Sequence, residues 1–303
     1  MVSPSPSTRS SSPRSARPVG TVTRGTTHQN RLRRMDRWIA ATHGPALRRA
    51  ADPVVVDLGY GAAPWTAVEL LRRLRAAEPR TEVVGIEIDP ARVAAALPYE
   101  TDGLRFRHGG FEIPLGVVSG AGGSGSGGGG TGAGAGADTG AGAAVPRRPV
   151  LIRAANVLRQ YDEAEVAGVW ARLCARLAPG GLLVEGTCDE IGRRHVWVAL
   201  GPEGPRTVTF ATRLGSLDRP SDLAERLPKA LIHRNVPGEP VHAFLRDFDR
   251  AWAAAAPYAS LGARQRWITA VRELSADWPL ADDPRRRRQG EVTVEWAALA
   301  PRS

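Results

Sequence analysis

The sequence has few cysteines, one lysine and no long apolar run. Only Cys174 and Cys188 occur among 303 residues, without Cys-x-x-Cys spacing, so neither a disulfide framework nor a zinc site is indicated. The six histidines show no ligand spacing, and no metal is predicted. No stretch approaches the ~20 apolar residues of a membrane helix, and the N-terminus lacks the apolar region of a secretory signal. These absences predict a cytoplasmic protein without a metal.

The positive charge is concentrated in the first part of the chain. The net charge is +10, and residues 1–50 contain ten arginines against a single acidic residue, Asp36. The remaining chain is therefore close to neutral. A basic chain suggests a nucleic-acid partner, but this distribution favours a solvated tail and a small or undefined molecule as the partner. The arginine run at 285–288 is likewise interpreted as a solvated loop, with nucleic-acid contact as the less favoured alternative.

Two segments have compositions that disfavour a packed core. Residues 1–24 are rich in serine, proline and arginine and are predicted to form a disordered tail. Residues 25–303 are predicted to form a single domain, interrupted at 116–148 by a flexible glycine-rich insertion. The insertion lacks the Lys-Ser/Thr ending of a phosphate-binding loop, so it is not predicted to be a site.

Strands and helices alternate in the first half of the chain, which predicts an open parallel sheet. The predicted elements there are a helix at 30–43 ended by Gly44-Pro45, a strand at 54–58, a helix through 67–74, a strand at 82–88, a helix from Pro90 and a strand at 104–108. The predicted elements of the second half are a strand at 150–152, a helix at 162–177, a strand at 182–187, a hairpin of 196–200 with 207–212, helices at 241–256 and 263–276, and a strand at 291–298.

The most informative segment is VVVDLGYGAAP at 54–64, a buried strand followed by a glycine turn and a helix. Gly59 and Gly61 let the backbone approach a ligand closely, and ligands of open α/β sheets bind at such strand ends. Asp57 would suit a ligand that carries an ammonium group. The dinucleotide pattern fits poorly, because Pro64 replaces its third glycine and Glu87 lies 28 residues after Gly59 rather than about 20.

The segment Asp57-Leu58-Gly59-Tyr60-Gly61-Ala62 resembles motif I of the class I S-adenosylmethionine-dependent methyltransferases. Residues 84–89 (VGIEID) resemble the second strand of that family, which ends in an acid. Residues 109–112 (GGFE) lie where the family has its adenine loop, 152–161 resemble its motif IV, and 177–185 resemble the turn before its fifth strand. The resemblance spans roughly 54–187, apart from the insertion.

The resemblance implies a Rossmann-like, open, mostly parallel seven-stranded sheet with helices on both faces, preceded by an N-terminal helix and the tail. It implies S-adenosylmethionine as the cofactor and an unidentified methyl acceptor. Glu87 would bind the ribose hydroxyls, and adenine would contact backbone groups and Phe111, because Gly110 replaces the family's usual aspartate. The candidate cofactor-binding residues are Asp57, Gly59, Tyr60, Gly61, Glu87, Ile88, Gly110, Phe111 and Asn156.

No catalytic base is identified by sequence, although Asp189 and Glu190 are candidates. Two other functions stay open: a non-catalytic protein that binds S-adenosylmethionine, and an NAD(P)-dependent oxidoreductase, which the glycine pattern disfavours. Structural roles compete with ligand binding at each candidate; Asp57, for example, could simply cap the next helix. The ligand interpretation requires Asp57 and Glu87 to face a common cavity.

Overall fold

The structure is a computed structural model that describes residues 18–22, 25, 27–118, 145–281 and 283–302. Residues 1–17, 23 and 24 of the predicted tail and 119–144 of the predicted insertion lie outside this part. The ends of the insertion are described: β4 (Val117–Val118) pairs with β5 (Val145–Pro146). Directly after β5, the Arg147 guanidinium group lies 2.7 Å from the Asp52 carboxylate and 2.9 Å from the Glu82 carboxylate. These ion pairs attach the C-terminal end of the insertion to the main sheet.

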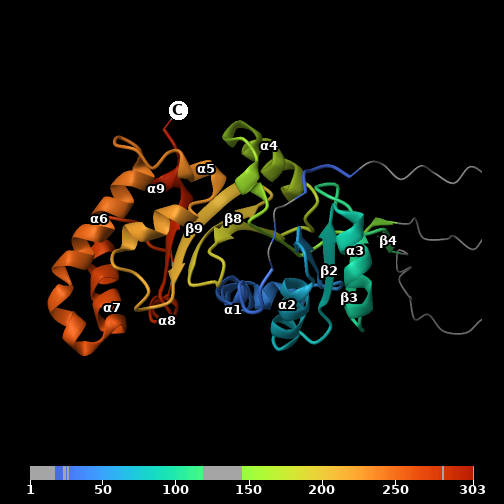
Figure 1. Cartoon of the computed structure of the whole chain (residues 1–303), viewed down its shortest axis with the longest axis horizontal. Coiled ribbons are helices and arrows are strands. Elements are labelled where there is room, and N and C mark those ends of the chain that lie inside the picture. Colours follow the sequence, from blue (N-terminus) through green and yellow to red (C-terminus); the bar gives the residue numbers. More distant parts are fainter. Residues whose placement is uncertain (1–17, 23–24, 26, 119–144, 282, 303) are drawn as a thin grey trace, which may run out of the picture.

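One eight-stranded sheet runs through the described residues (Figure 1). Its first half is parallel, in the order β3 (Leu104–His108), β2 (Glu82–Glu87), β1 (Val54–Leu58), β6 (Leu151–Ala155) and β7 (Leu182–Cys188). Its second half is an antiparallel meander of β8 (Arg194–Gly201), β9 (Gly204–Thr212) and β10 (Glu291–Glu295).

The predicted open, mostly parallel α/β sheet is therefore confirmed, with one correction. The resemblance implied seven strands, whereas the sheet has eight. The predicted hairpin follows β7 directly and pairs with it along β8, and the last strand then extends the meander. The strand segments visible in the sequence itself already numbered eight.

Helices cover both faces of the sheet, as predicted (Figure 1). Helices α1 (Arg33–Arg49) and α2 (Trp65–Arg75) bury their apolar stripes on one face. Helices α4 (Glu163–Cys174), α6 (Pro240–Ala254) and α7 (Ala263–Leu274) pack in the core of the other. Alternate residues of β1 point to opposite sides: Val55 joins the first core, and Val54 and Val56 join the second.

Short helices connect these elements. They are α3 (Pro90–Ala96), η1 (Leu97–Tyr99), η2 (Leu158–Gln160), η3 (Pro220–Arg226), α5 (Lys229–Ile232), η4 (Ala256–Leu261), α8 (Pro284–Arg287) and α9 (Trp296–Leu299).

The predicted end of the first helix at Gly44-Pro45 is wrong, because α1 continues to Arg49. An interior proline removes one backbone hydrogen bond and costs about 3 kcal/mol. The carbonyl that loses its partner belongs to Ala41, which is exposed and can bond to water. Leu47, in the turn after the proline, is completely buried, and its packing offsets the cost.

Candidate functional site

The glycine turn between β1 and α2 has the predicted strand–turn–helix form. Gly59 and Gly61 have φ values of 68° and 84°, in the left-handed region that favours glycine. A Cβ on Gly61 would lie 2.7 Å from Thr27 Oγ1, so a larger residue would also collide. The turn lies at the carboxyl end of β1, between β2 and β6, where open α/β sheets bind ligands.

This turn borders a cavity of about 560 Å³, called here the central cavity. Five of the predicted residues line it: Asp57, Gly59, Tyr60, Gly61 and Asn156. The rest of its wall includes the ends of β6 and β7, the 3-10 helix η2 and residues in the range 25–32. The volume is within the roughly 300–1,000 Å³ of small-molecule sites.

Asp57 is neutralised inside the protein. In the sheet it lies beside Arg153, whose Nε donates to Asp57 Oδ1 at 3.0 Å and whose Nη2 lies 2.7 Å from Oδ2. Thr66 Oγ1, in the first turn of α2, donates to Oδ2 at 2.8 Å. Arg153 also contacts Asp36 of α1, and all three charged side chains are buried. The carboxylate therefore fixes the start of α2 rather than presenting an unpaired charge to an ammonium group.

Glu87 holds the end of β2 against the glycine turn. Its Oε2 accepts a hydrogen bond from the Gly61 N–H at 2.9 Å, and its Oε1 accepts one from the Ile88 N–H at 2.9 Å. Glu87 lines a second, small cavity of about 20 Å³ with Ile88, Gly110 and Phe111. That space holds about one water molecule. Asp57 and Glu87 thus line neighbouring cavities, so the common cavity that the sequence interpretation required is not found; Gly59 lines both cavities.

The small cavity is reduced by a segment of the N-terminal tail, residues 19–21, called here the strap. Val19 C=O accepts a hydrogen bond from the Phe111 N–H at 2.8 Å, and Thr21 N–H donates to the Tyr161 hydroxyl at 2.6 Å. Gly20 lies against Ile88 and Phe111. This part of the predicted disordered tail is therefore ordered, because its backbone groups find partners that a composition-based prediction does not consider.

Two of the predicted residues, Tyr60 and Asn156, mainly stabilise the fold around the cavity. The Tyr60 ring is buried and packs edge-to-face on Phe106 with centroids 5.2 Å apart, and burial raises the pKa of its hydroxyl. Asn156 has a φ of 60°, and its side chain joins β6 to β7: Oδ1 accepts from the Cys188 N–H at 2.9 Å, and Nδ2 lies 3.2 Å from Cys188 Sγ. Asn156 nevertheless lines the central cavity.

Three arginines that were not predicted as site residues also line the central cavity: Arg31, Arg159 and Arg226. Arg31 Nε donates to Asp189 C=O at 2.9 Å, and Arg159 Nη1 donates to a backbone carbonyl at 3.0 Å. Burial and the nearby Arg226 lower the pKa of Arg159. Nε of Arg226 is buried without a hydrogen-bond partner among the described residues. These arginines come from distant parts of the sequence, so no local motif could have joined them.

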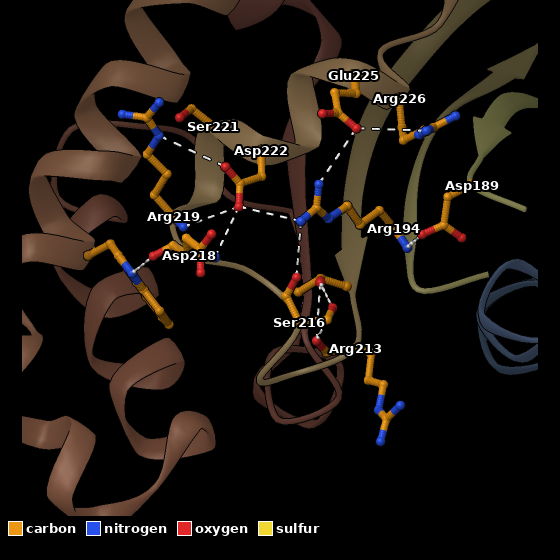
Figure 2. Close-up of polar contacts among 12 residues, drawn as sticks. Asp189, Arg194, Arg213, Ser216, Asp218, Arg219, Ser221, Asp222, Glu225 and Arg226 are labelled. Atoms are coloured by element: carbon orange, nitrogen blue, oxygen red, sulfur yellow. Dashed lines mark hydrogen bonds and ion pairs between the residues drawn. The ribbon is translucent and has the colours of Figure 1, made fainter. Parts of the chain in front are cut away.

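The two candidate bases differ in position. The Asp189 carboxylate accepts hydrogen bonds from the backbone N–H groups of Arg193 and Arg194 at 2.8 and 3.1 Å, so it caps a turn (Figure 2). Glu190 lines the central cavity, with its side chain 67% exposed and 3.9 Å from Arg226. Of the two, only Glu190 has a carboxylate available at this cavity.

The part of the chain that the structure describes contains no cluster of three or more metal-ligating side chains. Within the same residues, no helix has the length and apolar character needed to cross a bilayer.

The sequence matches no protein-family model and no curated protein, whereas 103 chains of solved structures are similar. The sugar N-methyltransferase KedS8 from a Streptoalloteichus species is 18% identical, with a TM-score of 0.32, over 71% of this chain and 73% of that one. The aminopentose methyltransferase CalS10 from Micromonospora echinaspora is 20% identical, with a TM-score of 0.29, over 58% and 63%.

Human N-acetylserotonin methyltransferase, solved with S-adenosylmethionine, is 18% identical, with a TM-score of 0.29, over 49% of this chain and 34% of its own. The matched region thus spans about a third of that protein and of two other solved methyltransferases.

Proposed function

We propose that the chain is an S-adenosylmethionine-dependent methyltransferase acting on an unidentified acceptor. One observation carries the proposal: a two-glycine turn at the end of a buried strand, tied to a buried carboxylate at the end of the next strand and bordering the central cavity. That arrangement provides close backbone approach and a diol-binding acid side by side.

Glu87 and the backbone around Phe111 would hold the nucleoside. Glu87 Oε2 keeps acceptor capacity for a ribose hydroxyl after its contact with the Gly61 N–H, whereas Oε1 already accepts from the N–H groups of Ile88 and Asp89. The Phe111 N–H, which is bonded to Val19 C=O, would donate to a ring nitrogen of adenine instead. The strap carbonyl therefore stands in for a nucleobase acceptor. Because the small cavity holds about one water, nucleoside binding requires the strap to withdraw.

The amino-acid end of the cofactor would reach the central cavity past Gly59, the residue common to both cavities. There Arg31 and Arg159 are candidates for its carboxylate, because guanidinium groups bind carboxylates well. This replaces the ammonium contact expected at Asp57, which Arg153 already neutralises.

When bound, the cofactor supplies a methyl group activated by its bond to a sulfonium sulfur, which is a good leaving group. The chain's own residues then have to align the acceptor and exclude water. Glu190 is the candidate proton acceptor if the acceptor atom carries an ionisable proton. The central cavity has room for a small molecule or for one unit of a larger one.

Calorimetry tests the proposal with S-adenosylmethionine and its demethylated product. We expect saturable binding that Glu87→Gln weakens at least tenfold, because the variant keeps the shape but loses a charged acceptor. Glu273→Gln, on the exposed side of α7, is the matched control and should bind as the unmodified chain does.

Transfer of a labelled methyl group to a component of a cell extract would separate an enzyme from the non-catalytic alternative. Binding without any transfer supports the non-catalytic protein. Absence of binding to either compound by a folded chain contradicts both.

A further inference from the structure

A third cavity, called here the arginine groove, has a volume of about 1080 Å³ and lies along α1, the loop before β8 and the start of β10. Six exposed arginines line it: Arg33, Arg37, Arg193, Arg213, Arg264 and Arg288. They come from α1, the loop before β8, the end of β9, the first turn of α7 and the end of α8, so the fold gathers them from distant parts of the sequence.

The charge of this groove is not neutralised within the described chain. None of the six arginine side chains has a hydrogen bond or ion pair with another described residue. The one carboxylate in the lining belongs to Glu291, and Arg286 holds both of its oxygens at 2.7 Å. Partial burial lowers the pKa of Arg37, and the neighbouring positive charge of Arg33 lowers it further.

In a neighbouring cluster around Arg194, by contrast, acidic side chains neutralise the arginine charge (Figure 2). Arg194 lies between Asp222 and Glu225, at 3.6 Å from each carboxylate. The Arg213 side chain points away from that cluster, and no contact is drawn to its guanidinium group. The interpretation of 285–288 as a solvated loop therefore needs correction, since 284–287 form α8 and Arg286 is buried on Glu291, while Arg288 lines the groove.

We propose that the arginine groove binds the phosphodiester backbone of a nucleic-acid strand. Guanidinium groups match phosphate oxygens in geometry and keep their charge at all physiological pH values. A single small anion would use two or three converging cations, whereas six dispersed along a groove suit a row of phosphates. The chain beyond residue 50 is nearly neutral overall, so its net charge does not indicate this local concentration of arginines.

The groove continues to the site of the proposed reaction. It shares Arg193 and Arg213 with an intermediate cavity of about 460 Å³, and that cavity shares Glu190 and Arg226 with the central cavity. A strand bound in the groove could therefore place one nucleotide at the central cavity. Only this last step, that the strand carries the methyl acceptor, rests on the proposed function; binding of the strand does not.

Fluorescence anisotropy tests the groove with the full chain and labelled 15-nucleotide single strands of RNA and of DNA, titrated at several salt concentrations. The test variant combines Arg213→Gln, Arg264→Gln and Arg288→Gln. Loss of three phosphate contacts is expected to weaken binding about a hundredfold near 0.1 M salt and to reduce the salt slope by about 2. The RNA and DNA arms identify which backbone is preferred.

The matched control combines Arg107→Gln, Arg172→Gln and Arg176→Gln, which removes equal charge from exposed positions outside the groove. It should retain most of the affinity and the salt slope. The proposal is overturned if both triple variants bind alike, because binding would then depend on overall charge or on the tail. It is also overturned if polyglutamate displaces labelled RNA as well as unlabelled RNA does. Calorimetry with S-adenosylmethionine on the same variants separates failure of the groove from failure of the proposed function.

Discussion

Removal of residues 1–22 is expected to raise the affinity for S-adenosylmethionine up to about fivefold. The strap is hydrogen-bonded to four residues on the nucleoside side of the site, Phe111, Glu112, Tyr161 and Gln160; the Gln160 amide donates to both the carbonyl and the hydroxyl of Thr21 and is counted as one contact. At about 1 kcal/mol net each they contribute roughly 4 kcal/mol, while ordering three residues costs about 3–6 kcal/mol. The closed strap is therefore favoured by at most about 1 kcal/mol, which corresponds to about a fivefold change in affinity.

Calorimetric titration of the full and truncated chains measures this effect. Because truncation also removes Arg9, Arg14 and Arg17, the comparison is made near 0.15 M salt, where the Debye length is about 8 Å. Gly20→Val in the full chain is a second test. Gly20 has a φ of 140°, and an added Cβ would lie 3.2 Å from the Tyr161 hydroxyl, so the variant should open the strap and raise affinity.

A tail substitution outside the strap, Ser10→Val, should leave the affinity unchanged. The reasoning fails if truncation lowers the affinity, because the strap would then cover a bound cofactor rather than compete with it. It also fails if Gly20→Val and truncation act in opposite directions.

Three further predictions concern buried charge. Arg153→Ala leaves Asp36 and Asp57 without their buried partner and should lower the unfolding free energy by about 3–5 kcal/mol in urea titration; an unchanged midpoint would contradict the network. Burial raises the pKa of Glu185 from 4.5 to about 8, so between these pH values the folded chain keeps a proton that the unfolded chain has lost. The free energy of unfolding should therefore fall by roughly 5 kcal/mol as pH rises from 4.5 to 8. Glu185→Gln should flatten that part of the melting profile, and an equal slope in both proteins would refute the assignment. Asp57→Asn should lower stability more than cofactor affinity, whereas Glu87→Gln should do the reverse; comparing melts and titrations of the two checks this.

The sequence was a good guide wherever a structure depends on neighbouring residues. The apolar run ending at Asp57 formed β1, and Gly59 and Gly61 took the left-handed turn expected of them. The hairpin around 201–204 and the two late helices also formed near their predicted bounds. Periodicity and turn chemistry carry this information within ten or fifteen residues.

Features that depend on distant residues were not predictable in this way. Arg153 is 96 residues from Asp57, and no local pattern shows that the two lie side by side on neighbouring strands. The strap lies in a segment whose composition indicates disorder, but its backbone finds partners at Phe111 and Tyr161. The arginine groove was not predicted, because the net charge of a sequence sums over the whole surface, whereas a ligand interacts with the local charge.

The central claim is tested most directly by a crystal structure of the chain lacking residues 1–22, grown with the demethylated cofactor. The account predicts adenine against the Phe111 backbone, the ribose hydroxyls on the Glu87 carboxylate and the amino-acid end beyond Gly59 in the central cavity. A ligand bound elsewhere, or a small cavity that stays closed without the strap, would contradict it.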